Sequence, residues 1–309
     1  MEIYLPIAET PVNLLVIMAM GAAVGFISGL LGIGGGFLLT PLLIFSGIPP
    51  AVAVASVTPQ IVASSTSGAL SYWRRKAIDL KLAGTLFVGG AIGSFGGAWV
   101  FARLGRTGNL ELVIALSYML LLGTIGALML AESVRALLRA RRGEAPVPRR
   151  PGAHNWIHGL PLKIRFRRSR LYVSLIPVIG LGVGVGFLGT LLGIGGGFIL
   201  VPALIYLLRV PTSIVIGTSL VQTLGTMATA TMLHATGTMT VDGVLAFLLM
   251  IGGVIGAQFG AQIGLRLRGE YLRAIMGLLV LAVGVRFGVN LVLPPPDPFS
   301  FAIIAGGVP

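Results

Sequence analysis

The sequence predicts an all-α polytopic membrane protein made of two inverted-topology repeats, each with about five helical segments and a glycine-broken short helix. Three observations predict this fold: the composition, an internal repeat and the distribution of basic residues. Of the 309 residues, 55% are hydrophobic and 10% are charged, whereas soluble domains carry about 25% charged residues. The apolar runs are continuous and long enough to cross a bilayer, which predicts membrane-spanning helices.

Long and short apolar segments predict the individual helices. The short segments, 36–46 and 197–208, each follow a glycine-rich stretch and fall below the ~17 residues normally needed to span. We therefore expect each of them to be tilted, half-length or re-entrant. The long segments lie at about 12–31, 50–72, 82–102, 110–130, 172–192, 211–235, 243–265 and 274–293.

An internal repeat relates the two halves of the chain. VGFISGLLGIGGGF (Val24 to Phe37) returns as VGFLGTLLGIGGGF (Val185 to Phe198), with eleven of fourteen positions identical at an offset of 161. The match continues through prolines, a glutamine, an aspartate and a glycine-rich helix, GGAIGSFGG and GGVIGAQFG, which we interpret as a packing surface. The predicted divisions are an outward tail (1–11), repeat 1 (12–131), a basic cytoplasmic linker (132–170), repeat 2 (171–293) and a second outward tail (294–309).

The basic residues predict the orientation of the chain. The stretch Arg135–Arg170 holds eleven of the 22 Lys and Arg residues, the pattern of a cytoplasmic loop and not of a nucleic-acid-binding surface. If each half crosses five times, the loops on the linker side hold 19 of the 22. An odd number of crossings per half inverts the halves relative to each other and places both termini outside. If the short segments are re-entrant, each half crosses four times, and the argument for inverted halves is weaker. The first apolar run lacks a basic leader and is expected to be retained.

The paired GIGGG segments predict a binding site. Glycine disfavours helix and allows positive φ, and irregular backbone at membrane depth is tolerated only in protein or beside a wet cavity. Helices that restart at Phe37 and Phe198 would direct free N–H groups and positive dipole ends at an anion. Close helix packing is the alternative explanation; a nucleotide loop is excluded because no GxxxxGK[ST] pattern occurs. The glycines assigned to the site are Gly34, Gly35, Gly36, Gly195, Gly196 and Gly197.

A polar stripe follows each short segment at a helical spacing that keeps its members on one face. In the first half it comprises Ser56, Gln60, Ser64 and Ser67. In the second half it comprises Thr218, Gln222, Thr226 and Thr229, at a constant offset of 162. Polar rows facing lipid are costly, so both stripes should face the interior. We assign Gln60, Gln222, Ser56, Ser64, Thr218 and Thr226 to substrate binding, with hydrogen bonds between helices as the alternative role.

Other classes of function lack the residues they need. There is no cysteine, and the nine acidic residues fall at loops, tails or helix ends, so no proton-relay carboxylate is evident. The sequence offers no catalytic arrangement, metal ligand set or cofactor motif, which predicts that the protein is not an enzyme. His234 ends a span, where a structural role is expected.

The chain resembles the TauE/SafE family in its doubled motif, GIGGGFLLTP and GIGGGFILVP. Each copy of the motif is followed by a proline, a small-residue helix with a glutamine, and a GG-x-x-G helix. The resemblance covers about 12–130 and 172–293. It implies a permease of the bacterial cytoplasmic membrane for sulfite, sulfoacetate, sulfonates or related C2 compounds.

The sequence therefore predicts a secondary transporter of a small anion. An anion channel, and a membrane scaffold or sensor acting through the basic linker, remain alternatives. The expected partners are the anion and the lipid bilayer, with the linker near anionic lipid. Nucleic acid is not expected. Glycine-rich faces permit a homodimer without requiring one.

Overall fold

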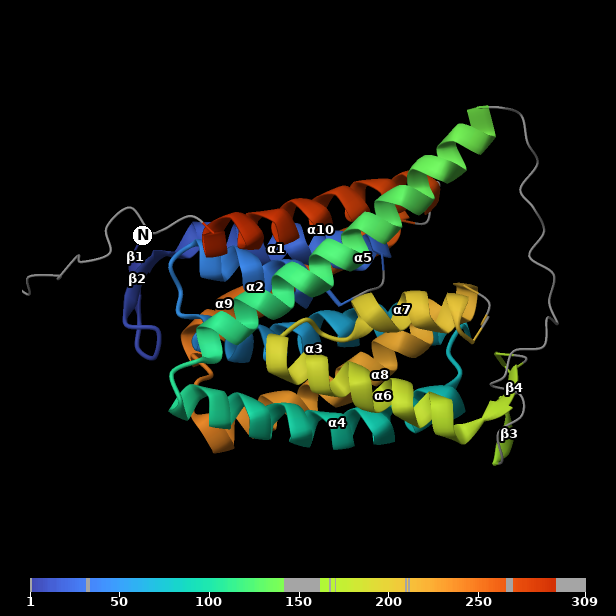
Figure 1. Ribbon diagram of the computed structural model, residues 1–309, viewed down its shortest axis with the longest axis horizontal. Coiled ribbons are helices and arrows are strands. Elements are labelled where there is room, and N and C mark those ends of the chain that lie inside the picture. The colour runs from blue at the N-terminus through green and yellow to red at the C-terminus, as the bar shows by residue number, and fades with distance from the viewer. Residues whose placement is uncertain are drawn as a thin grey trace, which may run out of the picture.

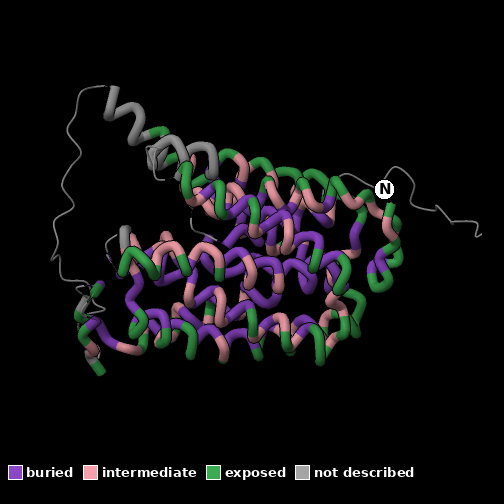
Figure 2. Tube along the Cα trace, turned by 180° about the vertical axis from the view of Figure 1, so that it is seen from behind, coloured by how far each residue is buried: buried purple, intermediate pink, exposed green. Residues whose placement is uncertain are grey.

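Helices dominate the computed structural model, and the strands found in it form short hairpins. Buried residues gather between the helices while exposed residues lie on the periphery (Figure 2). The structure describes residues 2–31, 34–141, 162–166, 168–169, 171–208, 210, 212–264 and 269–292.

The described part of the chain contains ten α-helices, five from each half. The first half has α1 (Leu14–Leu31), α2 (Gly36–Phe45), α3 (Pro50–Arg74), α4 (Leu80–Arg106) and α5 (Leu110–Arg141). The second has α6 (Leu175–Leu192), α7 (Gly197–Tyr206), α8 (Thr212–Leu233), α9 (Gly243–Gly264) and α10 (Gly269–Val292), with a π-helical turn, His234–Thr238, after α8. Five of them, α4, α5, α6, α8 and α9, contain stretches long and apolar enough to cross a membrane. The structure confirms the predicted all-α polytopic fold.

A β-hairpin precedes the first helix of each half. Strand β1 (Glu2–Leu5) pairs antiparallel with β2 (Thr10–Asn13), and β3 (Lys163–Phe166) pairs antiparallel with β4 (Leu171–Ser174). Neither hairpin was predicted, because each lies in a segment that the sequence assigned mainly to a tail or to the linker. The hairpins lie at opposite ends of the bundle (Figure 1). We call the end with β1–β2 the N-terminal end and the end with β3–β4 the linker end.

Two buried aspartates anchor these hairpins in equivalent ways. Asp242 caps α9, and its other carboxylate oxygen accepts a 2.9 Å hydrogen bond from the N–H of Ile7. Asp79 caps α4 and accepts hydrogen bonds from the N–H and hydroxyl of Ser169, at 2.9 and 2.8 Å. A carboxylate at a helix N-terminus satisfies otherwise unpaired N–H groups. Each aspartate therefore joins the entry of one half to a helix of the other.

The two halves are interleaved. Helix α1 packs along α9, and α6 packs along α4, so the first helix of each half pairs with the fourth helix of the other. Small residues make this possible: a Cβ on Gly25 would meet the backbone of Gly253, and one on Gly186 would meet the backbone of Gly90. Such close approach is a main source of helix association in lipid. The glycine-rich helices are thus confirmed as packing surfaces.

Equivalent helices of the two halves cross each other at the centre and run antiparallel. Near one end of the α3–α8 pair, the Thr231 hydroxyl donates to the Thr58 hydroxyl at 2.9 Å, while near the other end Gly217 lies beside Tyr72. Helices α5 and α10 also run antiparallel, since Gly284 packs on Gly123 and Gly277 on Leu130. Both α3 and α8 lie in the middle of the bundle (Figure 1).

The short helices turn back on the helices that precede them. Helix α2 has ten residues, about 15 Å of helix, which is half the thickness of a bilayer core. At its end, the hydroxyl of Ser46 lies 4.0 Å from the sulfur of Met20, so α2 returns toward the beginning of α1. Helix α3 then starts at the N-terminal end, with Pro50 in its first turn, where the absent N–H costs nothing.

The glycine crossings yield a first prediction. Replacing Gly93 by valine places a Cβ against the backbone of Val183 and Phe187, so helices α4 and α6 must separate. We expect the free energy of unfolding to fall by about 2 kcal/mol or more, measured by thermal unfolding in detergent.

Gly96→Val, on the same helix, is the matched control for this change. Its nearest neighbour would be the Phe187 ring at 3.6 Å, an ordinary contact. Equal unfolding temperatures for the two variants would contradict the packing role assigned to Gly93.

Candidate functional site

The two glycine breaks meet inside the protein. A Cβ placed on Gly34 would lie 3.8 Å from the carbonyl oxygen of Gly195, and one on Gly36 would meet the backbone of Gly193. The rings of Phe37 and Phe198, which follow the breaks, stack with their centroids 4.8 Å apart. The structure therefore brings together two segments that lie about 160 residues apart in the sequence.

Only glycine suits the backbone of the breaks. Gly34 and Gly35 have φ of 91° and 64°, and Gly195 and Gly196 have φ of 83° and 70°. Other residues rarely adopt this left-handed region. The chain can thus leave α1 or α6 and start the next short helix within a few residues.

The breaks satisfy some of their own N–H groups and leave others free. The sequence led us to expect free N–H groups throughout the first turns of α2 and α7. Instead, Leu38 and Leu39 donate to the carbonyl of Gly35, and Ile199 and Leu200 donate to that of Gly196.

In the second break, which the structure describes throughout, the N–H groups of Gly195, Gly196 and Phe198 have no acceptor among the described residues. All three residues are buried. Buried N–H groups are almost always paired, and here they lie at the positive end of α7. These donors suit a ligand that accepts hydrogen bonds.

The two glutamines of the polar stripes occupy equivalent places with different partners. Gln60 lies against Gly253 of α9, and Gln222 lies against Gly90 of α4. Both side chains are 0% exposed. Gln222 donates to the Thr226 hydroxyl at 2.8 Å and accepts from Thr223 at 3.4 Å.

Gln60 has no such partners. Its amide oxygen and nitrogen are both buried, and neither has a hydrogen-bond partner in the described structure. An amide left in this state costs about 1–3 kcal/mol. Both amide atoms of this side chain are therefore available for hydrogen bonds that the described residues do not supply.

The crossing of α3 and α8 sets the spacing of the stripe residues. Since Thr58 meets Thr231 and Gly68 meets Leu220, the crossing point falls near Ser64 and Thr226. Gln60 and Gln222 each lie one helical turn from it, in opposite directions along the bundle. The structure thus places them on either side of the crossing, with no hydrogen bond between their side chains.

A family model described as sulfite exporter TauE/SafE matches residues 17–287, from α1 through α10. The chain belongs to the TauE/SafE family. A "Probable membrane transporter protein" of Xylella fastidiosa strain 9a5c is 31% identical over 283 residues, which covers 88% of this chain and 94% of that protein. The Bacillus subtilis "Probable membrane transporter protein YjnA" is 30% identical over 273 residues, covering 87% and 98%.

A plant protein matches a shorter part of the chain. The Arabidopsis thaliana "Sulfite exporter TauE/SafE family protein 3" is 29% identical over 107 residues, which covers 33% of this chain and 22% of that protein. No solved structure matches the chain. The family and its members identify this TauE/SafE protein as a membrane transporter, and not as an enzyme.

Two of the stripe residues in this TauE/SafE protein form hydrogen bonds with the aspartates that cap α9 and α4. The Ser56 hydroxyl accepts a 2.9 Å hydrogen bond from the N–H of Asp242, and the Thr218 hydroxyl accepts one of 3.1 Å from the N–H of Asp79. The sequence assigned both hydroxyls to substrate binding, a role that stays a prediction. Their geometry in the structure gives each a partner in the opposite half.

The remaining predicted residues lie nearer the crossing. The Ser64 hydroxyl donates to the carbonyl of Ile61 at 3.2 Å, and Thr226 receives the amide of Gln222. Between the breaks stands the Ile61 side chain, which contacts both of them, and its equivalent in the second half is Thr223. The described residues contain no cluster of three or more metal-ligating side chains.

Sequence reasoning missed two polar side chains beside the second break. The Tyr118 hydroxyl donates to the carbonyl of Leu192 at 2.6 Å, and the Thr40 hydroxyl donates to that of Gly193 at 3.2 Å. Nothing marks either residue in the sequence, because neither belongs to a polar stripe or to a motif that recurs in the other half. His234 is fully buried, with Nε2 3.0 Å from the carbonyl of Thr190, a contact that fits the expected structural role.

The helix-cap contacts yield a second prediction. Ser56→Ala removes the acceptor of a buried N–H, so the free energy of unfolding should fall by about 1–3 kcal/mol. Substrate affinity of the folded protein should stay unchanged. Thermal unfolding and a ligand titration measure the two effects.

Thr66→Ala is the control, because the Thr66 hydroxyl is exposed and bonds only within α3. Full stability of Ser56→Ala combined with weaker substrate binding would instead assign the Ser56 hydroxyl to the site, as the sequence predicts.

Proposed function

We propose that this TauE/SafE protein is a secondary transporter that moves a small sulfur-containing or organic anion, such as sulfite, sulfoacetate or a sulfonate, across the cytoplasmic membrane by alternating access. The observation that carries the proposal is the unpartnered, fully buried amide of Gln60, which directly precedes Ile61, the residue whose side chain contacts both breaks. The free N–H groups of the second break add further donors. The word sulfite in the family description and in the names of the plant relatives suggests the sulfur-containing class.

The charges around the site favour an anion. The described carboxylates closest to the central helices are Asp79 and Asp242, and both are engaged in helix caps near the ends of the bundle. A cation would need carboxylates or a set of carbonyl ligands facing it. Amide and backbone N–H groups instead donate to oxyanions without adding net charge.

The arrangement of the halves supports alternating access. Equivalent helices that cross antiparallel, as α3 with α8 and α5 with α10, are what an inverted repeat produces. In such transporters one bundle rocks against the other around a fixed central site. The meeting point of the two breaks would be that site.

The basic residues support an orientation. Arg74, Arg75, Lys76 and Lys81 lie at the linker end, while Arg103 and Arg106 lie at the N-terminal end. By the positive-inside rule, the linker end would face the cytoplasm and both termini the periplasm. The bilayer would then be the main partner of the lipid-facing side chains.

Gln60→Leu tests the proposed site. The leucine removes an unsatisfied amide, so the ligand-free protein should keep or gain stability. Saturable stabilisation by the substrate anion should weaken at least tenfold, because hydrogen bonds to charged groups contribute about 1.5–3 kcal/mol each.

Thermal unfolding with sulfite, sulfate, sulfoacetate, taurine, acetate and chloride at fixed ionic strength measures both effects. Thr66→Val, on the exposed side of the same helix, is the matched control. A destabilised Gln60→Leu protein that binds the anion normally would refute the site.

Flux measurements in proteoliposomes separate the transport classes. Saturable flux with counter-transport of the anion supports the carrier. Conductance far above carrier turnover would instead identify an anion channel.

A further inference from the structure

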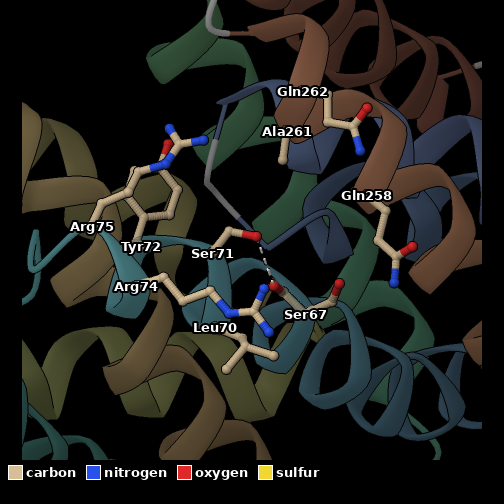
Figure 3. A pocket seen from close by; sticks show the side chains of 9 residues that line it. All are labelled: Ser67, Leu70, Ser71, Tyr72, Arg74, Arg75, Gln258, Ala261 and Gln262. Atoms are coloured by element: carbon tan, nitrogen blue, oxygen red, sulfur yellow. Dashed lines mark hydrogen bonds between the residues drawn. The ribbon is translucent and has the colours of Figure 1, made fainter.

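A polar pocket opens at the linker end, between the C-terminal parts of α3 and α9. Its volume is about 330 Å³. Ser67, Ser71 and Arg74 of α3 and its C-cap residue Arg75 line one side, and Gln258 and Gln262 line the other from α9 (Figure 3). It lies apart from the candidate site at the breaks.

The chemistry of the pocket selects for anions. Two guanidinium groups, two amides and three hydroxyls, those of Ser67, Ser71 and Tyr72, offer hydrogen-bond donors, and no carboxylate is among the described residues that line it. Arginine suits oxyanions because its planar group donates in pairs. A cleft lined by one sign of charge raises the local concentration of the opposite ion.

A row of polar side chains on α3 runs from the pocket to the unpartnered glutamine. Ser71, Ser67, Ser64 and Gln60 follow one another on a single face of α3 at helical spacing. The side chain of Gln60 lies against Gly253 of α9, the helix that also provides Gln258 and Gln262. From Ser67 to Gln60 the rise along α3 is about 10 Å. The same two helices thus form the wall of the pocket and the environment of the glutamine.

The equivalent place at the N-terminal end has a different chemistry. The residues equivalent to Gln258 and Gln262 are Phe95 and Trp99, which are 60% and 63% exposed. The positions equivalent to Arg74 and Arg75 hold Thr236 and Gly237.

The residue equivalent to Tyr72 is His234, which is fully buried and hydrogen-bonded to the carbonyl of Thr190. An amide side chain that faces lipid would destabilise the folded protein, because its polar groups find no hydrogen-bond partner there. An aromatic ring that faces lipid carries no such penalty. At the N-terminal end, one guanidinium, that of Arg103, lies 5.5 Å from the centroid of the Trp99 ring. Of these two equivalent places, the one at the linker end is thus lined by two amides and two arginines among the described residues, and the other by aromatic rings beside one arginine.

From these observations, and resting on the proposed function, we infer that the pocket is the linker-side entry for the transported anion. Arg74 and Arg75 attract the oxyanion, Gln258 and Gln262 accompany it, and Ser67 and Ser64 lead toward Gln60. The neighbouring Lys76 carries the same charge but does not line the pocket. Substituting Lys76 therefore distinguishes attraction of the anion by the pocket arginines from attraction by the general excess of positive charge at this end.

The absence of cysteine makes the pocket directly testable. In Ser71→Cys, purified in an uncharged detergent, the new thiol should react with an anionic methanethiosulfonate reagent about tenfold faster than with a cationic one at low salt. Higher ionic strength should reduce this preference, because salt screens the arginines. Added sulfoacetate should slow the reaction. Gln262→Cys provides a second reporter on the opposite wall.

Charge substitutions complete the experiment. In the Ser71→Cys background, replacing Arg74 and Arg75 together by glutamine should reduce the anion preference about tenfold, while Lys76→Gln should change it less than twofold. An equal loss in both variants, or no loss in either, would overturn the inference. So would a lack of reaction at both cysteines, because the pocket would then be closed to water.

Two further outcomes separate this inference from the proposed function. The Arg74→Gln, Arg75→Gln protein should show a raised KM for sulfoacetate presented at the linker end and an unchanged KM at the other end. If the protein transports sulfoacetate with an unchanged KM at both ends, the inference fails and the proposed function stands. If none of the tested anions binds or is transported, both fail, even where labelling remains charge-selective.

Discussion

The requirement to pair buried backbone polar groups governs this structure. In lipid, a non-helical segment survives only where protein surrounds it, and the two glycine breaks are enclosed by each other and by the helices around them. Gly34 approaches Gly195, the rings of Phe37 and Phe198 stack, and Ile61 contacts both breaks. The same enclosure leaves N–H groups of the second break without acceptors. The arrangement that encloses the breaks is therefore also the one that leaves the donors of the proposed site.

Much of the fold could be predicted because its signals are local or repeated. Hydropathy located most helices to within a few residues, and the GIGGG repeat located the two short ones. The exception is α5, which continues to Arg141, eleven residues past its predicted end, because its last three turns are rich in polar and basic residues and carry no hydropathy signal. The hairpins β1–β2 and β3–β4 were missed because their strands have only four residues each. Their stability depends on tertiary contacts with Asp242 and Asp79, and no short-range pattern encodes such contacts.

For the candidate site residues, burial was easier to predict than hydrogen bonding. Matching polar stripes identified Gln60 and Gln222, and the structure buries both. Their different hydrogen bonding depends on neighbours: Thr223 and Thr226 bond to Gln222, where the first half has Ile61 and Ser64. Ser56 and Thr218 share the stripe yet meet backbone N–H groups of the opposite half. Periodicity shows which face a residue lies on, but it does not identify the partner across that face.

The interleaving of the halves also bears on biosynthesis. The glycine face of α1 packs on α9, and Gly25 and Gly253 lie 228 residues apart in the sequence. At about 5–20 residues per second, α9 leaves the ribosome on the order of 10 to 50 seconds after α1. During that interval the first half lies in the membrane with its most closely packed surface uncovered. Assembly of this protein is therefore a late, whole-chain event, and the nascent first half is the species most in need of protection by the insertion machinery.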